Sequence, residues 1–424
     1  MSRKVDPVNA SPVSRAAWRR LVVLTVFAGL TAGVSISVLR MQPFGFVVND
    51  GRLDRVMDFA SHRAFACAAW SGDTADLQSG SVYTLEAHLR ATEQWSGLPA
   101  RIALPFGYSP TMLWILAPFC LLTERTAFAA WTLAGVLATV LASVRGNVHW
   151  RALLALATPL TVYAGALGQT AILSTAGLLV LIANDRDSRP SDICWGSAAV
   201  LWLLTAKPPL ALTAGTALIA RGRWRTVAVA MLLTIASTVA LQPWLGHAWM
   251  QDYGLLLAGY DRLHLPASFA WSIVPESMSN LRAMLHPDLG LPDDIANRVS
   301  SAVWATALGA IILSARRRSL DWSIAWNLST LSYLLFCPHV SATEDLALCV
   351  VLATLDVRGL PKAAAAGAAT LVIVGLVLSP AIGPLHNTRP SVLFFVKLGL
   401  VGISLAAIDS LQEQQTIPRQ RKRP

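Results

Sequence analysis

Residues 21–39, LVVLTVFAGLTAGVSISVL, form an apolar run of 19 residues without a charged side chain. A helix of that length spans the roughly 30 Å hydrocarbon core of a bilayer. No small-residue cleavage motif follows the run, so we interpret it as a retained first membrane span rather than a signal peptide.

The whole chain has the composition of a polytopic membrane protein. Of its 424 residues, 54% are hydrophobic and only 14% are charged, and the mean hydropathy is +0.52. These values exclude an ordinary globular protein. The net charge of +10 does not indicate nucleic-acid binding, because the basic residues fall in short clusters between apolar runs.

With this first run included, the chain contains about twelve apolar runs that are candidate transmembrane helices. They lie at roughly 18–40, 126–144, 152–167, 169–184, 193–206, 208–220, 226–244, 299–315, 322–337, 345–357, 363–384 and 391–408. Most Lys and Arg clusters fall on the inner side when the N-terminus is placed in the cytoplasm. The sequence therefore predicts an all-α, polytopic integral membrane protein.

Residues 108–123, YSPTMLWILAPFCLLT, look like one more span. A full crossing here would put the basic clusters near 145, 186 and 221 on conflicting sides of the membrane. We therefore predict a helix in the outer interface, with Ser109 as its N-cap and Pro110 at its first position.

Two long outer segments, 41–107 and 245–298, divide the helical chain. The predicted parts are a cytoplasmic tail (1–17), a core module that includes the first outer loop (18–244), the second outer loop (245–298), C-terminal transmembrane helices (299–408) and a basic cytoplasmic tail (409–424).

The five cysteines show no paired spacing, so we predict neither a disulfide framework nor a zinc site. They are Cys67, Cys120, Cys194, Cys337 and Cys349. Glu344 and Asp345 could bind a metal, but no second set of ligands accompanies them. We expect metal-independent chemistry without a cofactor, and we treat these two acids as cavity or helix-start residues.

Short motifs in a particular order mark a family resemblance. They are MDFASHRAFACAAWSGD (57–73), LPFGYSPTMLWILAPFCLL (104–122), AGALGQTAIL (164–173), LLTAKPPLAL (203–212), RGRWR (221–225) and CPHVSATEDLAL (337–348). Over roughly residues 20–357 the chain resembles glycosyltransferase family 87, which belongs to the GT-C superfamily of integral membrane glycosyltransferases. The resemblance implies a GT-C core module over 18–244 with a catalytic outer loop at 41–107.

The activity implied by this resemblance is transfer of a hexose, mannose first, from a polyprenyl-phosphate carrier to a lipid-linked or cell-surface glycan acceptor. It would occur on the outer, periplasmic face of a bacterial-type inner membrane. In GT-C enzymes an acid in the first outer loop serves the transfer, and the matching residue here is Asp58. A carboxylate can act as general base for the acceptor hydroxyl; Asp50 and Asp54 are the alternates.

The lipid phosphate leaves as an anion, which requires positive or hydrogen-bonding groups near the outer face. The candidate substrate-binding residues are Arg63, Tyr108, Gln169, Lys207 and His339. Arg63 either holds phosphate or pairs with a loop acid, and Tyr108 and Gln169 either line the cavity or make structural hydrogen bonds. Lys207 either binds substrate or extends to the interface, and His339 either binds substrate or packs at a helix end. We assign no special role to His62.

A transporter or flippase for an amphipathic solute is the alternative class of function. Such proteins also need broken helices and polar residues within the membrane, but their breaks are usually paired between two halves. Both breaks expected here, near residues 168 and 206, lie in the first half of the chain. A catalytically inactive protein of the same fold is a further alternative.

Overall fold

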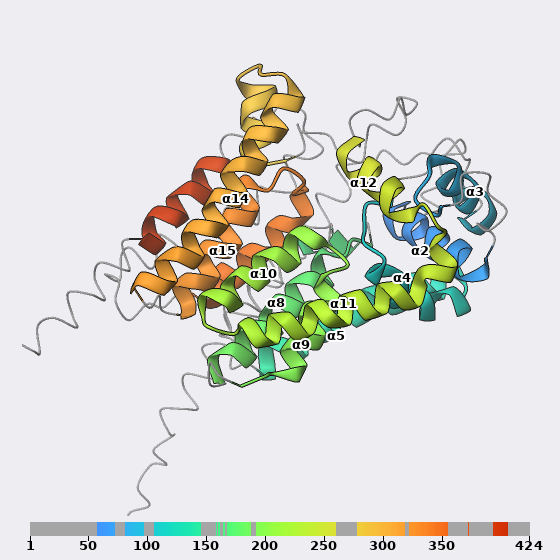
Figure 1. Cartoon of the computed structure of the whole chain (residues 1–424), viewed down its shortest axis with the longest axis horizontal. Helices are drawn as coiled ribbons and strands as arrows, with labels where there is room; N and C mark the ends of the chain where they lie inside the picture. The colour runs from blue at the N-terminus through green and yellow to red at the C-terminus, as the bar shows by residue number, and fades with distance from the viewer. Residues whose placement is uncertain are drawn as a thin grey trace, which may run out of the picture.

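The computed structural model describes most of the chain between residues 57 and 405. The described residues are 57–72, 81–96, 106–145, 158, 160–161, 164–165, 168–187, 192–259, 278–318, 322–354, 372 and 393–405. The predicted first span, both predicted tails and the alternate acids Asp50 and Asp54 lie outside them. Within the described ranges every regular element is a helix, which confirms the all-α class for this part of the chain (Figure 1).

The helices follow the predicted apolar runs closely where both can be compared. They are α2 (Met57–Ser71), α3 (Leu85–Ser96), α4 (Thr111–Leu116), the 3-10 helix η2 (Ala117–Leu121), α5 (Glu124–Arg145), α8 (Ala171–Asp187), α9 (Trp195–Leu204), α10 (Pro208–Ala220), α11 (Trp224–Leu245), α12 (Trp249–Gly259), α13 (Leu281–Ala283), the π-helical turn η5 (Met284–Asp288), α14 (Asp293–Arg318), α15 (Trp322–Phe336), the 3-10 helix η6 (Ala342–Ala347) and α16 (Leu348–Thr354). A further helix spans Leu393–Leu405.

Two of the described helices are long and apolar enough to cross a membrane. These segments are Trp224–Leu245, which is α11, and Asp293–Arg317, within α14. The surface of α11 exposes large apolar side chains, among them Met231, Leu232 and Val239, as expected of a helix in contact with lipid. The other described apolar segments are 10–17 residues long, and the predicted count of twelve spans is not confirmed.

The helices enclose two large hydrophobic clusters that meet at the break between α9 and α10. The first cluster includes Phe59 and Trp131 and occupies the end of the molecule with α2 and α4 (Figure 1). The second cluster lies among α8, α10 and α15. Ala206 belongs to the first cluster, whereas Leu204 and Leu210 on either side of it belong to the second. The break therefore joins the two halves of the core.

The breaks expected from the sequence near residues 168 and 206 are both present. Gly168 has a φ of 66°, a conformation that glycine adopts without a steric penalty, and its carbonyl accepts a hydrogen bond of 3.0 Å from the indole of Trp131. At the second break, Lys207 is the N-cap of α10 and Pro208 is its first residue, where a missing backbone N–H costs nothing.

The segment predicted as an interfacial helix forms α4 followed by η2. Together they run from Thr111 to Leu121, which is too short to cross the roughly 30 Å core of a bilayer. The predicted capping by Ser109 is wrong, because Pro110 occupies the N-cap and makes no side-chain cap. The Ser109 hydroxyl instead donates to the carbonyl of Thr205 at 2.6 Å and fixes α4 against the break after α9.

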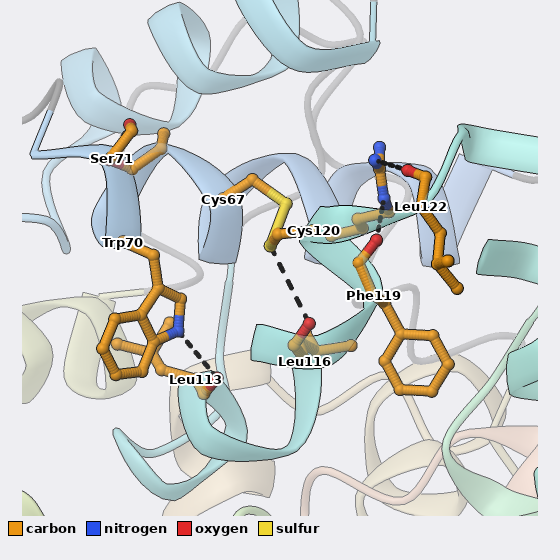
Figure 2. The surroundings of a disulfide bond; sticks show 10 residues. Cys67, Trp70, Ser71, Leu113, Leu116, Phe119, Cys120 and Leu122 are labelled. Atoms are coloured by element: carbon orange, nitrogen blue, oxygen red, sulfur yellow. Dashed lines mark hydrogen bonds between the residues drawn. A yellow bond between two sulfur atoms is a disulfide. The ribbon is translucent and has the colours of Figure 1, made fainter.

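A disulfide bond joins Cys67 of α2 to Cys120 of η2, so the prediction of no disulfide is wrong (Figure 2). The two cysteines are 53 residues apart in the sequence, but packing of α2 on η2 brings their Cα atoms to 5.3 Å, within the range that a disulfide requires. Sequence spacing carries no trace of this pairing, because it arises only when the helices pack. On the same helix, the Trp70 indole donates to the carbonyl of Leu113 at 3.0 Å.

Candidate active site

Asp58 lies in the first turn of α2, with its side chain partly exposed. The Gln169 side-chain amide donates a hydrogen bond to its carboxylate. Gln169 directly follows the left-handed turn at Gly168, so the helix break aims the amide at α2. Burial raises the pKa of Asp58 to about 6, although the hydrogen bond from Gln169 acts in the opposite direction.

Tyr108 contacts the residue after Gln169, and the backbone N–H of Ser109, which follows Tyr108, donates to the carbonyl of Ala206 at the second helix break. The Tyr108 hydroxyl is 3.2 Å from the hydroxyl of Thr170. The charges of Asp58, Lys207 and Glu344 all act on the Tyr108 phenol, which places these groups in one polar region. Four of the predicted site residues, Asp58, Tyr108, Gln169 and Lys207, are thus brought together from four segments of the chain.

Lys207 forms an ion pair with Glu344 of η6. The Tyr333 hydroxyl of α15 donates to the same carboxylate, and the Ser341 hydroxyl donates to it at 3.2 Å. These contacts hold a charged pair at the N-terminal end of α10, where the helix dipole favours an anion. The sequence offered no reason to connect Lys207 with Glu344, because the two residues are 137 positions apart.

The next residue in η6, Asp345, points to a second and fully buried ionic cluster. Lys397, on the Leu393–Leu405 helix, pairs with Asp345 at 2.5 Å, and both side chains are inaccessible to solvent. Ser279 donates to Asp345 at 2.9 Å and accepts from Lys397 at 2.5 Å. Neighbouring acids of one short helix are therefore held by two different lysines.

Arg63 lies away from this polar region. Its Nε atom donates to the carbonyl of Phe119 at 2.9 Å, and its Nη2 atom donates to the carbonyl of Leu122 at 2.5 Å. The guanidinium therefore ties α2 to η2, beside the disulfide. A role in phosphate binding is untested for Arg63.

His339 lies in the turn after α15 and is partly exposed. Its charge acts on Asp293, at the start of α14, which also pairs with Arg282 at 2.8 and 2.5 Å. The structure therefore associates His339 with the α13–α14 corner. A role for His339 in substrate binding is likewise untested.

His62 is the residue at the site to which sequence reasoning gave no role. It follows Asp58 by four positions on α2, a spacing that places two side chains on the same helix face. The imidazole contacts the Tyr108 ring, with centroids 4.8 Å apart, and the charge of Lys207 acts on it. This four-residue spacing was the available signal.

Comparison with protein families gives one match. The model of glycosyltransferase family 87 matches residues 106–341, more than half of the chain. Tyr108, Gln169, Lys207 and His339 lie within the matched range, whereas Asp58, Arg63 and Glu344 lie outside it. Comparison with curated proteins and with solved structures found no match.

Proposed function

From the premise that this chain belongs to glycosyltransferase family 87 and is a membrane glycosyltransferase, we propose that it moves a hexose, mannose first, from a polyprenyl-phosphate carrier. The acceptor is a hydroxyl group of a lipid-linked or cell-surface glycan, and the general base is Asp58. Membership of this family favours group transfer over the transporter alternative.

The observation that carries the proposal is the state of the Asp58 carboxyl group. A pKa of about 6 leaves this carboxylate ionised at pH 7 and more basic than an ordinary aspartate. Gln169 fixes one of its oxygen atoms. An orientation fixed in this way suits a base that must meet one hydroxyl proton.

The proposed reaction is a single displacement at the anomeric carbon. Asp58 takes the proton as the acceptor oxygen forms its bond to that carbon, and the bond from carbon to phosphate oxygen breaks with its electron pair on the phosphate. One displacement without a covalent sugar–enzyme intermediate inverts the anomeric centre. The carrier's apolar tail, held in the bilayer, keeps the phosphate–sugar bond beside the base and makes the step effectively intramolecular.

The break before α10 is the proposed site for the leaving phosphate. Lys207 supplies a positive charge there, at the N-terminal end of a 13-residue helix, where the helix dipole also favours an anion. In the structure Glu344 pairs with this lysine. A donor phosphate would compete with Glu344 for the ammonium group, so we expect binding of the donor to loosen that ion pair.

The disulfide supports an active site on the outer face. Disulfides persist in oxidising compartments such as the periplasm and are rare in the cytosol. Cys67 lies on the same helix as Asp58, nine residues further along. If the bond forms outside the cytoplasm, Asp58 lies on that side of the membrane too.

Transfer assays on the purified protein in lipid test the proposal. They use radiolabelled polyprenyl-phosphate-mannose, with the glucose and arabinose donors in parallel, and a membrane lipid extract as acceptor. We expect Asp58→Asn to lower the rate about 10²- to 10⁴-fold while the protein stays folded. The exposed acid Asp294 provides the matched control, and Asp294→Asn should transfer normally. Equal transfer by Asp58→Asn would assign the base to another residue, and no transfer from any donor would reject the proposed substrate class.

A further inference from the structure

Two buried histidines on neighbouring helices differ in one respect that sequence does not reveal. His88, on α3, uses both ring nitrogens: its Nδ1 atom donates to the carbonyl of Thr84 at 2.7 Å, and its Nε2 atom accepts from the backbone N–H of Phe106 at 2.7 Å. Its role is therefore structural, because it joins α3 to the segment before α4.

His62 is almost as buried as His88, with exposed fractions of 8% and 3%. Its Nδ1 atom, however, has no hydrogen-bond partner in the part of the chain that the structure describes. The imidazole packs against the Phe106 and Tyr108 rings, at centroid distances of 5.9 and 4.8 Å. Buried polar atoms in native proteins nearly always have partners, so an unmatched one calls for an explanation.

The position of His62 supplies that explanation. It lies one helical turn after Asp58 on the same face of α2, about 6 Å further along the axis. The Tyr108 ring that it contacts also feels the charge of Asp58. The His62 ring therefore lies beside the polar region that contains the carboxylate.

We propose that His62 is a substrate-binding residue whose ring hydrogen-bonds a sugar hydroxyl group next to the one that reacts at Asp58. This inference rests on the proposed function, because it names a contact of the substrate at that same site. The Nδ1 atom is closed to solvent in this structure, so a shift of the surrounding side chains must open that edge of the ring before bound sugar supplies the partner that it lacks among the described residues.

A hydroxyl group matches the imidazole better than a phosphate does. Burial, together with the charges of Lys207 and His88, lowers the pKa of His62 to about 3, so the ring is neutral at pH 7. A neutral imidazole has one donor nitrogen and one acceptor nitrogen, and a hydroxyl group can pair with either. Phosphate favours cationic donors, and the neighbouring cation Arg63 is occupied by backbone carbonyls.

The experiment combines variants of His62 with substrates that lack single hydroxyl groups. We expect His62→Phe to lower kcat/KM about 5- to 30-fold, as for the loss of one hydrogen bond. One monodeoxy substrate should then be used equally well by the wild type and by His62→Phe, because the contact is absent in both. The arm in which this substrate occurs, deoxy donor or deoxy acceptor, identifies the sugar that His62 contacts.

His62→Asn and His88→Phe are the comparison variants. An asparagine amide can restore a polar group near the Nδ1 position, so His62→Asn should recover part of the activity that His62→Leu loses. His88→Phe should lower the midpoint of thermal unfolding and leave the discrimination among deoxy substrates unchanged. A purely structural role for His62 would give the same result for both positions.

Two results would overturn the inference. One is a constant ratio of wild-type to His62→Phe activity across all deoxy substrates; the other is unchanged activity in His62→Phe. Equilibrium binding, measured by tryptophan fluorescence on both proteins, provides a test that does not depend on turnover. The two ligands are polyprenyl-phosphate-hexose and an acceptor that lacks only the reacting hydroxyl group. An inactive wild type would reject the proposed function, and equal affinities of both proteins for both ligands would then reject the role of His62 separately.

Discussion

The Gln169 amide donates a hydrogen bond to the carboxylate of Asp58, across 111 residues of sequence. This contact joins the first turn of α2 to the break before α8. It also holds the proposed base in a partly buried position, and burial there determines the basicity of the carboxyl group.

The pH dependence of transfer follows from the Asp58 carboxyl group. Because the base must be ionised and its pKa is about 6, we expect kcat/KM to be constant above about pH 7. It should fall roughly tenfold for each pH unit below about pH 5.5. A pH profile of kcat/KM, measured with one donor and one acceptor, checks this acidic fall. A rate that is constant down to about pH 4 would contradict the prediction.

Gln169→Leu should move the acidic fall in kcat/KM to higher pH. The amide hydrogen bond favours the ionised carboxylate, so its removal raises the pKa of Asp58 further and depletes the active form at a given pH. The exposed glutamine of α12 provides the control, since Gln251→Leu replaces the same side chain at an exposed position. Coincident profiles for the Gln169→Leu protein and the wild type would show that the amide does not influence the base.

Arg63→Met should act on stability rather than on donor binding. The guanidinium donates to two backbone carbonyls of the η2 region, and hydrogen bonds of a charged group contribute about 1.5–3 kcal/mol. We expect a lower midpoint of thermal unfolding and a donor KM within about twofold of the wild type. A large increase in KM with unchanged stability would instead support the phosphate-binding role that the sequence suggested.

Removal of the disulfide should destabilise the α2–η2 contact. Cys67→Ala combined with Cys120→Ala is expected to lower the free energy of unfolding by about 2–4 kcal/mol. A thiol reductant should lower the stability of the wild type by a similar amount and leave the double variant unchanged. The oxidised, denatured wild type should show the three free cysteines Cys194, Cys337 and Cys349; titration of five thiols would rule out the bond.

Lys397→Met should lower the free energy of unfolding more than most single substitutions do. It leaves Asp345 charged and buried without its lysine, which typically costs about 3–5 kcal/mol. The double variant Lys397→Met/Asp345→Leu removes both charges and should be more stable than the single one. The exposed pair of Arg298 and Asp294 is the control, since Arg298→Met should change stability by less than about 0.5 kcal/mol. Equal destabilisation in both pairs would show that burial of the Lys397 pair has no special effect.

The sequence predicted those parts of the fold that depend on local chemistry. The glycine at 168 and the prolines after Lys207 indicate helix breaks by their own backbone preferences, and both breaks are present. The apolar runs likewise mark where helices form. These signals act within a few residues of one another, so a single sequence is sufficient to read them.

Contacts between distant segments could not be predicted from the sequence. The bond from Cys67 to Cys120 and the ion pair of Lys207 with Glu344 exist only because separate helices pack together. The position of Arg63, in contrast, could have been predicted from the sequence. A residue five positions from Asp58 lies on another face of the helix than one four positions away, so helical geometry could have favoured His62 over Arg63 at the site.

The two adjacent acids of η6 obtain their lysine partners at different times during synthesis of the chain. Glu344 completes the polar region at Lys207, while Asp345 depends on Lys397, which the ribosome adds some fifty residues later. Until that late helix has been made and inserted, the acid beside Glu344 lacks its counter-ion in an apolar interior. A chain that terminates early would therefore carry an unneutralised charge next to the proposed site. Such a chain would be locally destabilised there, even though every residue that we propose to touch the sugar had already been synthesised.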